Sequence, residues 1–245
     1  MRPITITVEG RAGAGAPDIG RAVARELGFD FVDRLLLADI AKRAGATVGA
    51  LAEHERRLPS APSRLAQAVQ RMLHRSAIAG MGGDPYFGPG IETLLARPYR
   101  ELEESPATGA DEVDEQRFIA TTAEVIRDIA GVGNCVILSR GGGAILRGNP
   151  DVLRVGVVSR MEDRVGRIKM RERLGEAEAK EFIRHSDLAQ HRYFERAFKS
   201  SPIDPFLYHF MLNTSDVGLE FATGMIVAAA GQLSDGKLLS RGESQ

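Results

Sequence analysis

The stretch that most constrains the fold is residues 4–28, which predict a strand, a glycine loop and a helix. "ITITVEG" (4–10) alternates β-branched residues and ends in glycine, so it predicts a buried strand that enters a turn. "PDIGRAVARELG" (17–28) repeats apolar residues at i, i+4 and i+8, which predicts an amphipathic helix closed by a glycine. A short second strand at 29–33 follows. This order is typical of the first unit of a parallel α/β sheet.

The loop inside "VEGRAGAGAPDIG" (8–20) resembles the phosphate-binding pattern G-x-x-x-x-G-K-[ST]. Gly10 and Gly15 stand where the pattern has glycines, but Ala16 and Pro17 replace the lysine and the hydroxyl. A glycine turn at the start of a helix still presents backbone N–H groups at the positive end of the helix dipole. We therefore expect a donor-phosphate site on the backbone of Gly10, Arg11, Ala12, Gly13, Ala14, Gly15 and Ala16.

Two other interpretations of this loop stay open from the sequence. The loop could be a tight turn that only joins a strand to a helix. It could also belong to a Rossmann dinucleotide site, with Gly13 and Gly15 as G-x-G and Asp33 as the ribose-binding acid. The Rossmann pattern is incomplete, because an aspartate stands at position 18 where a third glycine is required.

Composition excludes some classes of function. With 33 acidic and 32 basic side chains the formal net charge is −1, which gives no general attraction to a nucleic-acid polymer or an anionic membrane. The sequence shows neither a signal peptide nor a transmembrane stretch, so we expect a cytoplasmic protein. The single cysteine, Cys135, lies in an apolar run and is expected to be a buried structural thiol.

The C-terminal half predicts further strands and a charged helical region. "NCVILSRGGG" (134–143) and "VLRVGVVS" (152–159) are apolar runs typical of central parallel strands, and 207–215 predicts a last strand before a helix at 216–233. Residues 160–198 are rich in both charges and predict helices.

His185 and His191 lie six residues apart without a third ligand, so we expect no metal site there. Tyr193, Phe194 and Phe198 are expected to pack their helix.

Four stretches together resemble the cytidylate kinase-like branch of the P-loop nucleoside monophosphate kinases. They are the loop unit at 4–28, "GFDFVDRLLLADIAKRAG", "GNCVILSRGGGAILRGNPDVLRVGVVSRMEDRVGRI" and "LNTSDVGLE". The resemblance implies an α/β fold of the P-loop NTPase-like three-layer type, with a central parallel sheet flanked by helices, a helical insertion and a mobile arginine-rich lid. The implied division is a core at 1–45 and 132–235 with the lid at about 160–200, an acceptor-binding insertion at 46–131, and a polar tail at 236–245.

The resemblance also implies roles for single residues. Arg140 would reach the acceptor, and Arg164, Arg167 and Arg171, at i, i+3 and i+7 on one helical face, would neutralise the transferred phosphoryl group. These four arginines are the expected catalytic residues. The expected substrate-binding residues are Asp33, Arg34, Arg184, Asp187 and Arg192. Arginine suits these roles because its planar guanidinium binds phosphate through two parallel hydrogen bonds and stays charged.

The implied function is transfer of the γ-phosphoryl group of ATP to a (deoxy)nucleoside monophosphate such as CMP, with Mg²⁺ arriving in the nucleotide complex. The expected partners are nucleotide substrates, with a homodimer as a further candidate. The family commonly has an arginine where Pro17 stands, and this chain lacks that cation as well. The alternatives are a catalytically inactive relative that binds a nucleotide or anion and acts as a regulator or oligomerisation surface, and a Rossmann-type oxidoreductase.

Overall fold

The computed structural model describes residues 2–33, 109–138 and 141–238. The helix expected at 34–45, most of the expected insertion, and the predicted site residues Arg34 and Arg140 lie outside the described residues. Within the described ranges, none of the helices has both the length and the apolar character that crossing a membrane requires.

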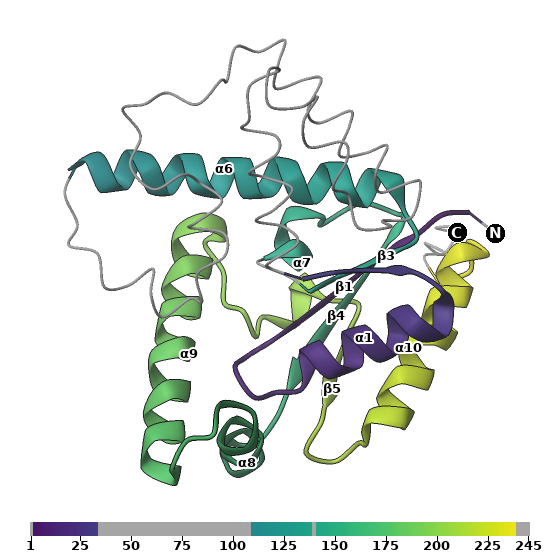
Figure 1. Ribbon diagram of the computed structural model, residues 1–245. Coiled ribbons are helices and arrows are strands. Elements are labelled where there is room, and N and C mark those ends of the chain that lie inside the picture. Colours follow the sequence, from purple (N-terminus) through teal and green to yellow (C-terminus); the bar gives the residue numbers. More distant parts are fainter. Residues whose placement is uncertain (1, 34–108, 139–140, 239–245) are drawn as a thin grey trace, which may run out of the picture.

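The described chain forms a five-stranded parallel sheet of order β2-β3-β1-β4-β5 (Figure 1). The strands are β1 (Thr5–Gly10), β2 (Asp30–Val32), β3 (Cys135–Leu138), β4 (Val152–Val158) and β5 (Phe210–Asn213). Because β3 lies between β1 and β2, the order differs from that of a Rossmann fold, in which the first two strands are neighbours. This finding removes the Rossmann interpretation of the loop, and with it the Rossmann-type alternative.

Helices cover both faces of the sheet, which gives three layers (Figure 1). One face is covered by α1 (Ala16–Leu27) and α10 (Leu219–Ser234), which pack side by side. The other face is covered by α6 (Gly109–Val132), the short α7 (Gly142–Ile145) and the end of α9 (Glu176–Phe198). Apart from these layers, α8 (Met161–Glu172) packs against the first half of α9. The predicted three-layer α/β fold is confirmed.

Alternation along the strands explains why two cores form. In β1, Ile6 and Val8 are fully buried against α1 and α10, whereas the Thr5 hydroxyl donates to the Ala130 carbonyl of α6 at 3.1 Å. Successive side chains of a strand point to opposite faces, so one strand serves both cores. Figure 1 shows the sheet between these two groups of helices.

Cys135 and the aromatic residues of α9 lie where the sequence predicted them. The thiol is 2% exposed, and burial raises the pKa of Cys135 to about 12, so it stays a neutral structural group. Tyr193 and Phe194 are buried, and both pack edge to face with Phe198. The packing role predicted for these rings is confirmed.

Two predicted strands are shorter than expected, each for a local reason. Of the strand expected at 134–143, the three glycines take no part, because Gly141 takes a φ of 83° and caps α7, which begins at Gly142. Before β5, the Asp204 carboxylate accepts the Phe206 N–H at 3.0 Å and caps a 3-10 turn, Pro205–Leu207. This turn occupies the first residue of the strand expected at 207–215.

Candidate functional site

The loop between β1 and α1 lies at the carboxyl edge of the sheet, where ligands bind in open α/β folds. Gly13 and Gly15 take φ values of 78° and 91°, which side chains other than glycine rarely adopt. The Ala14 N–H donates to the Arg11 carbonyl at 2.9 Å and closes the turn. The residue before α1, Gly15, has no side chain that could cap the helix, so the first amides of α1 are available to an anion.

The two residues that depart from the phosphate-binding pattern fit the fold well. Ala16 is 3% exposed and begins α1, and Pro17 lies in the first helical turn, where a missing N–H costs no intrahelical bond. Both residues therefore preserve the backbone frame of the loop. They lack two side-chain groups of the phosphate-binding pattern, the lysine cation at position 16 and the hydroxyl at position 17.

Arg164 of α8 is the most deeply buried of the predicted lid arginines, with 5% of its side chain exposed. Its Nε donates to the Ala12 carbonyl of the loop at 2.8 Å. Its two terminal nitrogens donate to the carboxylate of Asp187 on α9, at 2.9 and 2.6 Å. One guanidinium thus joins the loop, α8 and α9.

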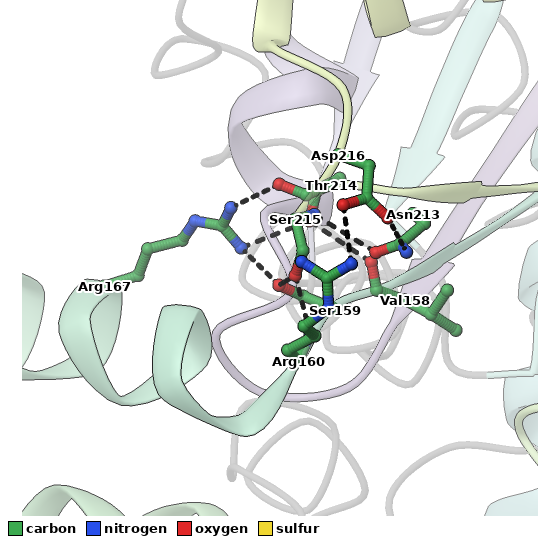
Figure 2. Close-up of polar contacts among 8 residues, drawn as sticks. All are labelled: Val158, Ser159, Arg160, Arg167, Asn213, Thr214, Ser215 and Asp216. Atoms are coloured by element: carbon green, nitrogen blue, oxygen red, sulfur yellow. Dashed lines mark hydrogen bonds and ion pairs between the residues drawn. The ribbon is translucent and has the colours of Figure 1, made fainter.

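Arg167, one helical turn further along α8, also reaches the loop. One terminal nitrogen donates to the Gly13 carbonyl at 3.0 Å and to the hydroxyls of Ser159 and Thr214 at 3.0 and 3.1 Å. The other donates to the Thr214 carbonyl at 2.8 Å. Figure 2 shows Arg167 extending from α8 to the residues that follow β4 and β5.

The turn after β5 completes this side of the site. The Thr214 hydroxyl lies 2.8 Å from the Ala14 carbonyl of the loop and 3.2 Å from the Val158 carbonyl at the end of β4. A hydroxyl has one proton, so the shorter contact marks the Ala14 carbonyl as its main acceptor. Beside it, Arg160 pairs with Asp216 at 2.7 Å and has an exposed guanidinium (Figure 2).

The sequence did not single out Thr214, although the stretch "LNTSDVGLE" was part of the resemblance. Its only signal in the sequence is its place directly after the last strand. In a parallel sheet that place is the same edge as the glycine loop.

Arg11 is the only charged residue among loop positions 10–16, and it faces an acid. Its guanidinium lies 3.7 Å from the Asp187 carboxylate, and its buried Nε has no hydrogen-bond partner among the described residues. Behind the loop, Glu9 at the end of β1 is 2% exposed and accepts the Gly141 N–H at 3.1 Å. The sequence did not single out Glu9. The feature that could have pointed to Glu9 in the sequence is its acidic side chain within an otherwise apolar strand.

The other predicted site residues have different surroundings. Asp33 follows β2 at the carboxyl edge of the sheet and is half-buried. Arg171 and Arg184 are exposed, and each pairs with an acid of its own helix, Glu172 at 2.9 Å and Glu181 at 2.6 Å. Arg192 is exposed on α9. The contacts therefore bring together the loop, Arg164, Arg167 and Asp187, whereas Arg171 lies further along α8.

The prediction that His185 and His191 hold no metal stays a prediction. His185 lies 2.6 Å from a carboxylate oxygen of Glu181, so its ring has a partner on the same helix. Across the described part of the chain, no three His, Cys, Asp or Glu side chains gather closely enough to hold a metal ion.

The parallel order, the glycine loop at its carboxyl edge and the arginines around it define a P-loop kinase-like α/β protein. A sequence model described as the cytidylate kinase-like family matches residues 5–216. The chain belongs to this family, which confirms the resemblance seen in the sequence. No curated protein matches the chain.

Solved structures with a similar fold are distant in sequence. An uncharacterized protein from Eubacterium ventriosum is 15% identical, with 93% of this chain and 98% of that chain covered and a TM-score of 0.60. A shikimate kinase from Acinetobacter baumannii in complex with shikimate is 14% identical, with 97% and 96% covered and a TM-score of 0.45. A shikimate kinase from Bacteroides thetaiotaomicron is 13% identical, with 92% and 96% covered and a TM-score of 0.43. At 15% identity, the likeness to the first structure shows the fold alone. The TM-scores of the two shikimate kinases are too low to support any conclusion about this chain.

Proposed function

We propose that this protein binds ATP at the Gly10–Ala16 loop and transfers its γ-phosphoryl group to a nucleoside monophosphate such as CMP. The observation that carries the proposal is the loop itself. Two positive-φ glycines place an uncapped helix N-terminus at the carboxyl edge of the sheet, and two arginines of α8 contact the loop from outside. Backbone amides and fixed positive charge are what phosphoryl transfer requires of a protein.

The acceptor would bind on the side of β2 and β3, next to the donor phosphates. We assign Asp33, Arg34, Arg184, Asp187 and Arg192 to the acceptor, and Arg140 to its phosphate or base. We assign the insertion at 46–131 to acceptor binding, and Arg171 of the lid to the transferred phosphoryl group. In-line transfer then depends on alignment of the two nucleotides rather than on covalent chemistry by the protein.

The residues of the loop do not fit a protein-held Mg²⁺ ion. The side chain of Pro17 has no oxygen ligand where the phosphate-binding pattern has a hydroxyl, and the side chain of Ala16 has no donor where the pattern has a lysine. Mg²⁺ enters the proposal only as part of the ATP complex, in which the phosphate oxygens and water are its ligands. No step is assigned to a metal held by the chain.

Ala16 and Pro17 also support a second candidate, a family member that binds a nucleotide without transferring the phosphoryl group. Removing one electrostatic contribution to a transition state costs about 3 kcal/mol, or roughly a hundredfold in rate. Binding through backbone amides is less sensitive to these two positions. The inactive protein would act through its bound state or its surface, as a regulator or in oligomerisation.

A screen of phosphoryl transfer separates the two candidates. ATP is incubated with each ribo- and deoxynucleoside monophosphate, and ADP release is measured together with ATP affinity by calorimetry. Turnover with one acceptor that is lost in Arg140→Ala, but kept in the exposed control Arg25→Ala, supports the kinase. ATP binding without turnover on any acceptor supports the inactive binder, and absence of ATP binding contradicts both.

A further inference from the structure

Three successive carbonyls of the glycine loop each accept a hydrogen bond from a side chain outside the loop. Ala12 O accepts from Arg164 Nε at 2.8 Å, and Gly13 O accepts from Arg167 at 3.0 Å. Ala14 O accepts from the Thr214 hydroxyl at 2.8 Å. We call Arg164, Arg167 and Thr214 the carbonyl brace.

The carbonyl brace fixes the direction of the loop amides. All described peptide bonds are trans, and in a trans peptide the C=O of one residue and the N–H of the next point in opposite directions. Since the carbonyls of Ala12 and Ala14 point toward α8 and the end of β5, the N–H groups of Gly13 and Gly15 point away from them. The Ala14 N–H between them closes the turn on the Arg11 carbonyl, so the amides of Gly13 and Gly15 are the ones that this arrangement leaves for an anion.

The two arginines of the carbonyl brace differ in whether a carboxylate neutralises their charge. Arg164 pairs with the Asp187 carboxylate through two hydrogen bonds. The partners of Arg167 are two carbonyls and two hydroxyls, all neutral. No ion pair joins Arg167 to a carboxylate of the described chain. A half-buried positive charge therefore lies against the Gly13 carbonyl, at the back of the loop.

We infer that Thr214 and Arg167 are positioning residues of the phosphate loop, and that Arg167 supplies from behind the loop the positive charge that Ala16 does not supply from within it. Thr214 orients the 14–15 peptide, while Arg167 orients the 13–14 peptide and adds a field that attracts anions. This inference rests on the proposed nucleotide binding at the loop. It gives Arg167 a place behind the loop, in contrast to the lid role predicted from the sequence.

The test measures the Kd of the full chain for ATP and for inorganic tripolyphosphate by calorimetry, at several salt concentrations. Thr214→Val keeps the shape of the side chain and removes the hydroxyl, so we expect both affinities to fall about fivefold to tenfold. Its salt dependence should equal that of the wild type, because no charge is lost. Arg167→Met should weaken both ligands by about tenfold or more and also flatten the salt dependence.

Two further variants separate positioning from a general effect on folding. Arg160→Met removes the neighbouring cation of Figure 2, which pairs with Asp216 and makes no hydrogen bond to the loop within the described structure, so both affinities should stay within about twofold. Thr214→Ser keeps the hydroxyl and removes only the methyl group, so its affinities for both ligands should equal those of the wild type. Thermal unfolding of all four variants shows that each Kd refers to folded protein.

The outcomes distinguish the inference from the function on which it rests. Equal affinities of wild type, Thr214→Val and Arg167→Met would overturn the carbonyl brace while leaving nucleotide binding intact. An equal loss of affinity in Thr214→Val and Thr214→Ser would also overturn it, because the serine variant still has the hydroxyl. A wild-type chain that binds neither ATP nor tripolyphosphate would overturn the inference and the proposed function together.

Discussion

Arg164 of α8 and Asp187 of α9 form a two-pronged ion pair, with nitrogen–oxygen distances of 2.9 and 2.6 Å. Only 5% of the arginine side chain and 17% of the aspartate side chain are exposed, so the pair is shielded from water and salt. Arg164 also donates to the Ala12 carbonyl, so the pair joins the α8–α9 unit to the glycine loop.

Asp187→Asn should destabilise the protein by about 3 kcal/mol, because it leaves the buried Arg164 guanidinium without a counter-charge. Urea unfolding followed by circular dichroism measures the change. The matched control is Glu181→Gln on the same helix, whose pairs with Arg184 and His185 are exposed. The control should stay within about 0.5 kcal/mol of the wild type. Equal effects of the two substitutions would show that the buried pair has no special role.

Thr7→Val should stabilise the protein by about 1 kcal/mol. The Thr7 side chain is fully buried, and its hydroxyl has no hydrogen-bond partner in the part of the chain that the structure describes, so the folded state carries the cost of an unsatisfied polar group. Thr5→Val is the matched control on the same face of β1. The Thr5 hydroxyl donates to the Ala130 carbonyl at 3.1 Å, so its loss should destabilise by about 1 kcal/mol. The same sign for both substitutions in urea unfolding would refute this interpretation.

Gly13→Ala should weaken tripolyphosphate binding by at least about tenfold and also lower stability. At a φ of 78°, a Cβ atom would lie 2.7 Å from the Arg164 carbonyl oxygen, so the loop must move away from α8. Gly28→Ala is the control for backbone strain alone, since its φ is 64° and no heavy atom lies within 4 Å of the added Cβ. Calorimetry and urea unfolding of both variants give the two effects. Unchanged tripolyphosphate affinity in Gly13→Ala would show that the loop tolerates this movement.

Much of the fold could be predicted because its signals are local. The β-branched run before Gly10 and the apolar run around Val136 predicted central strands, and both are buried in the sheet. The helix from residue 17 was predicted from its period, and α1 starts at Ala16. These patterns depend on neighbours within one turn or one strand, which a single sequence contains.

The site could be predicted only in part, because its contacts join distant segments. The i, i+3, i+7 spacing correctly placed Arg164 and Arg167 on one face of α8, yet it could not show that this face meets the glycine loop. The Thr214 hydroxyl and the Ala14 carbonyl lie 200 residues apart in the chain. Their contact depends on the strand order, which puts the ends of β1, β4 and β5 next to one another.

Stability should fall when the pH drops below the ordinary range of histidine, because of His209 beside β5. The His209 Nδ1 accepts the backbone N–H of Arg154 at 3.0 Å, an interaction that requires the neutral ring. Burial, and next the charge of Arg154, lower the pKa of His209 in the folded protein. The unfolded chain therefore binds this proton more readily, so the contribution of His209 is present above a pH of about 6.5 and is lost below it. Tm measured between pH 5 and 8 should fall less steeply toward acid in His209→Asn, whose amide oxygen can accept the same N–H without titrating. Parallel Tm curves for the variant and the wild type would show that other groups control the acid side.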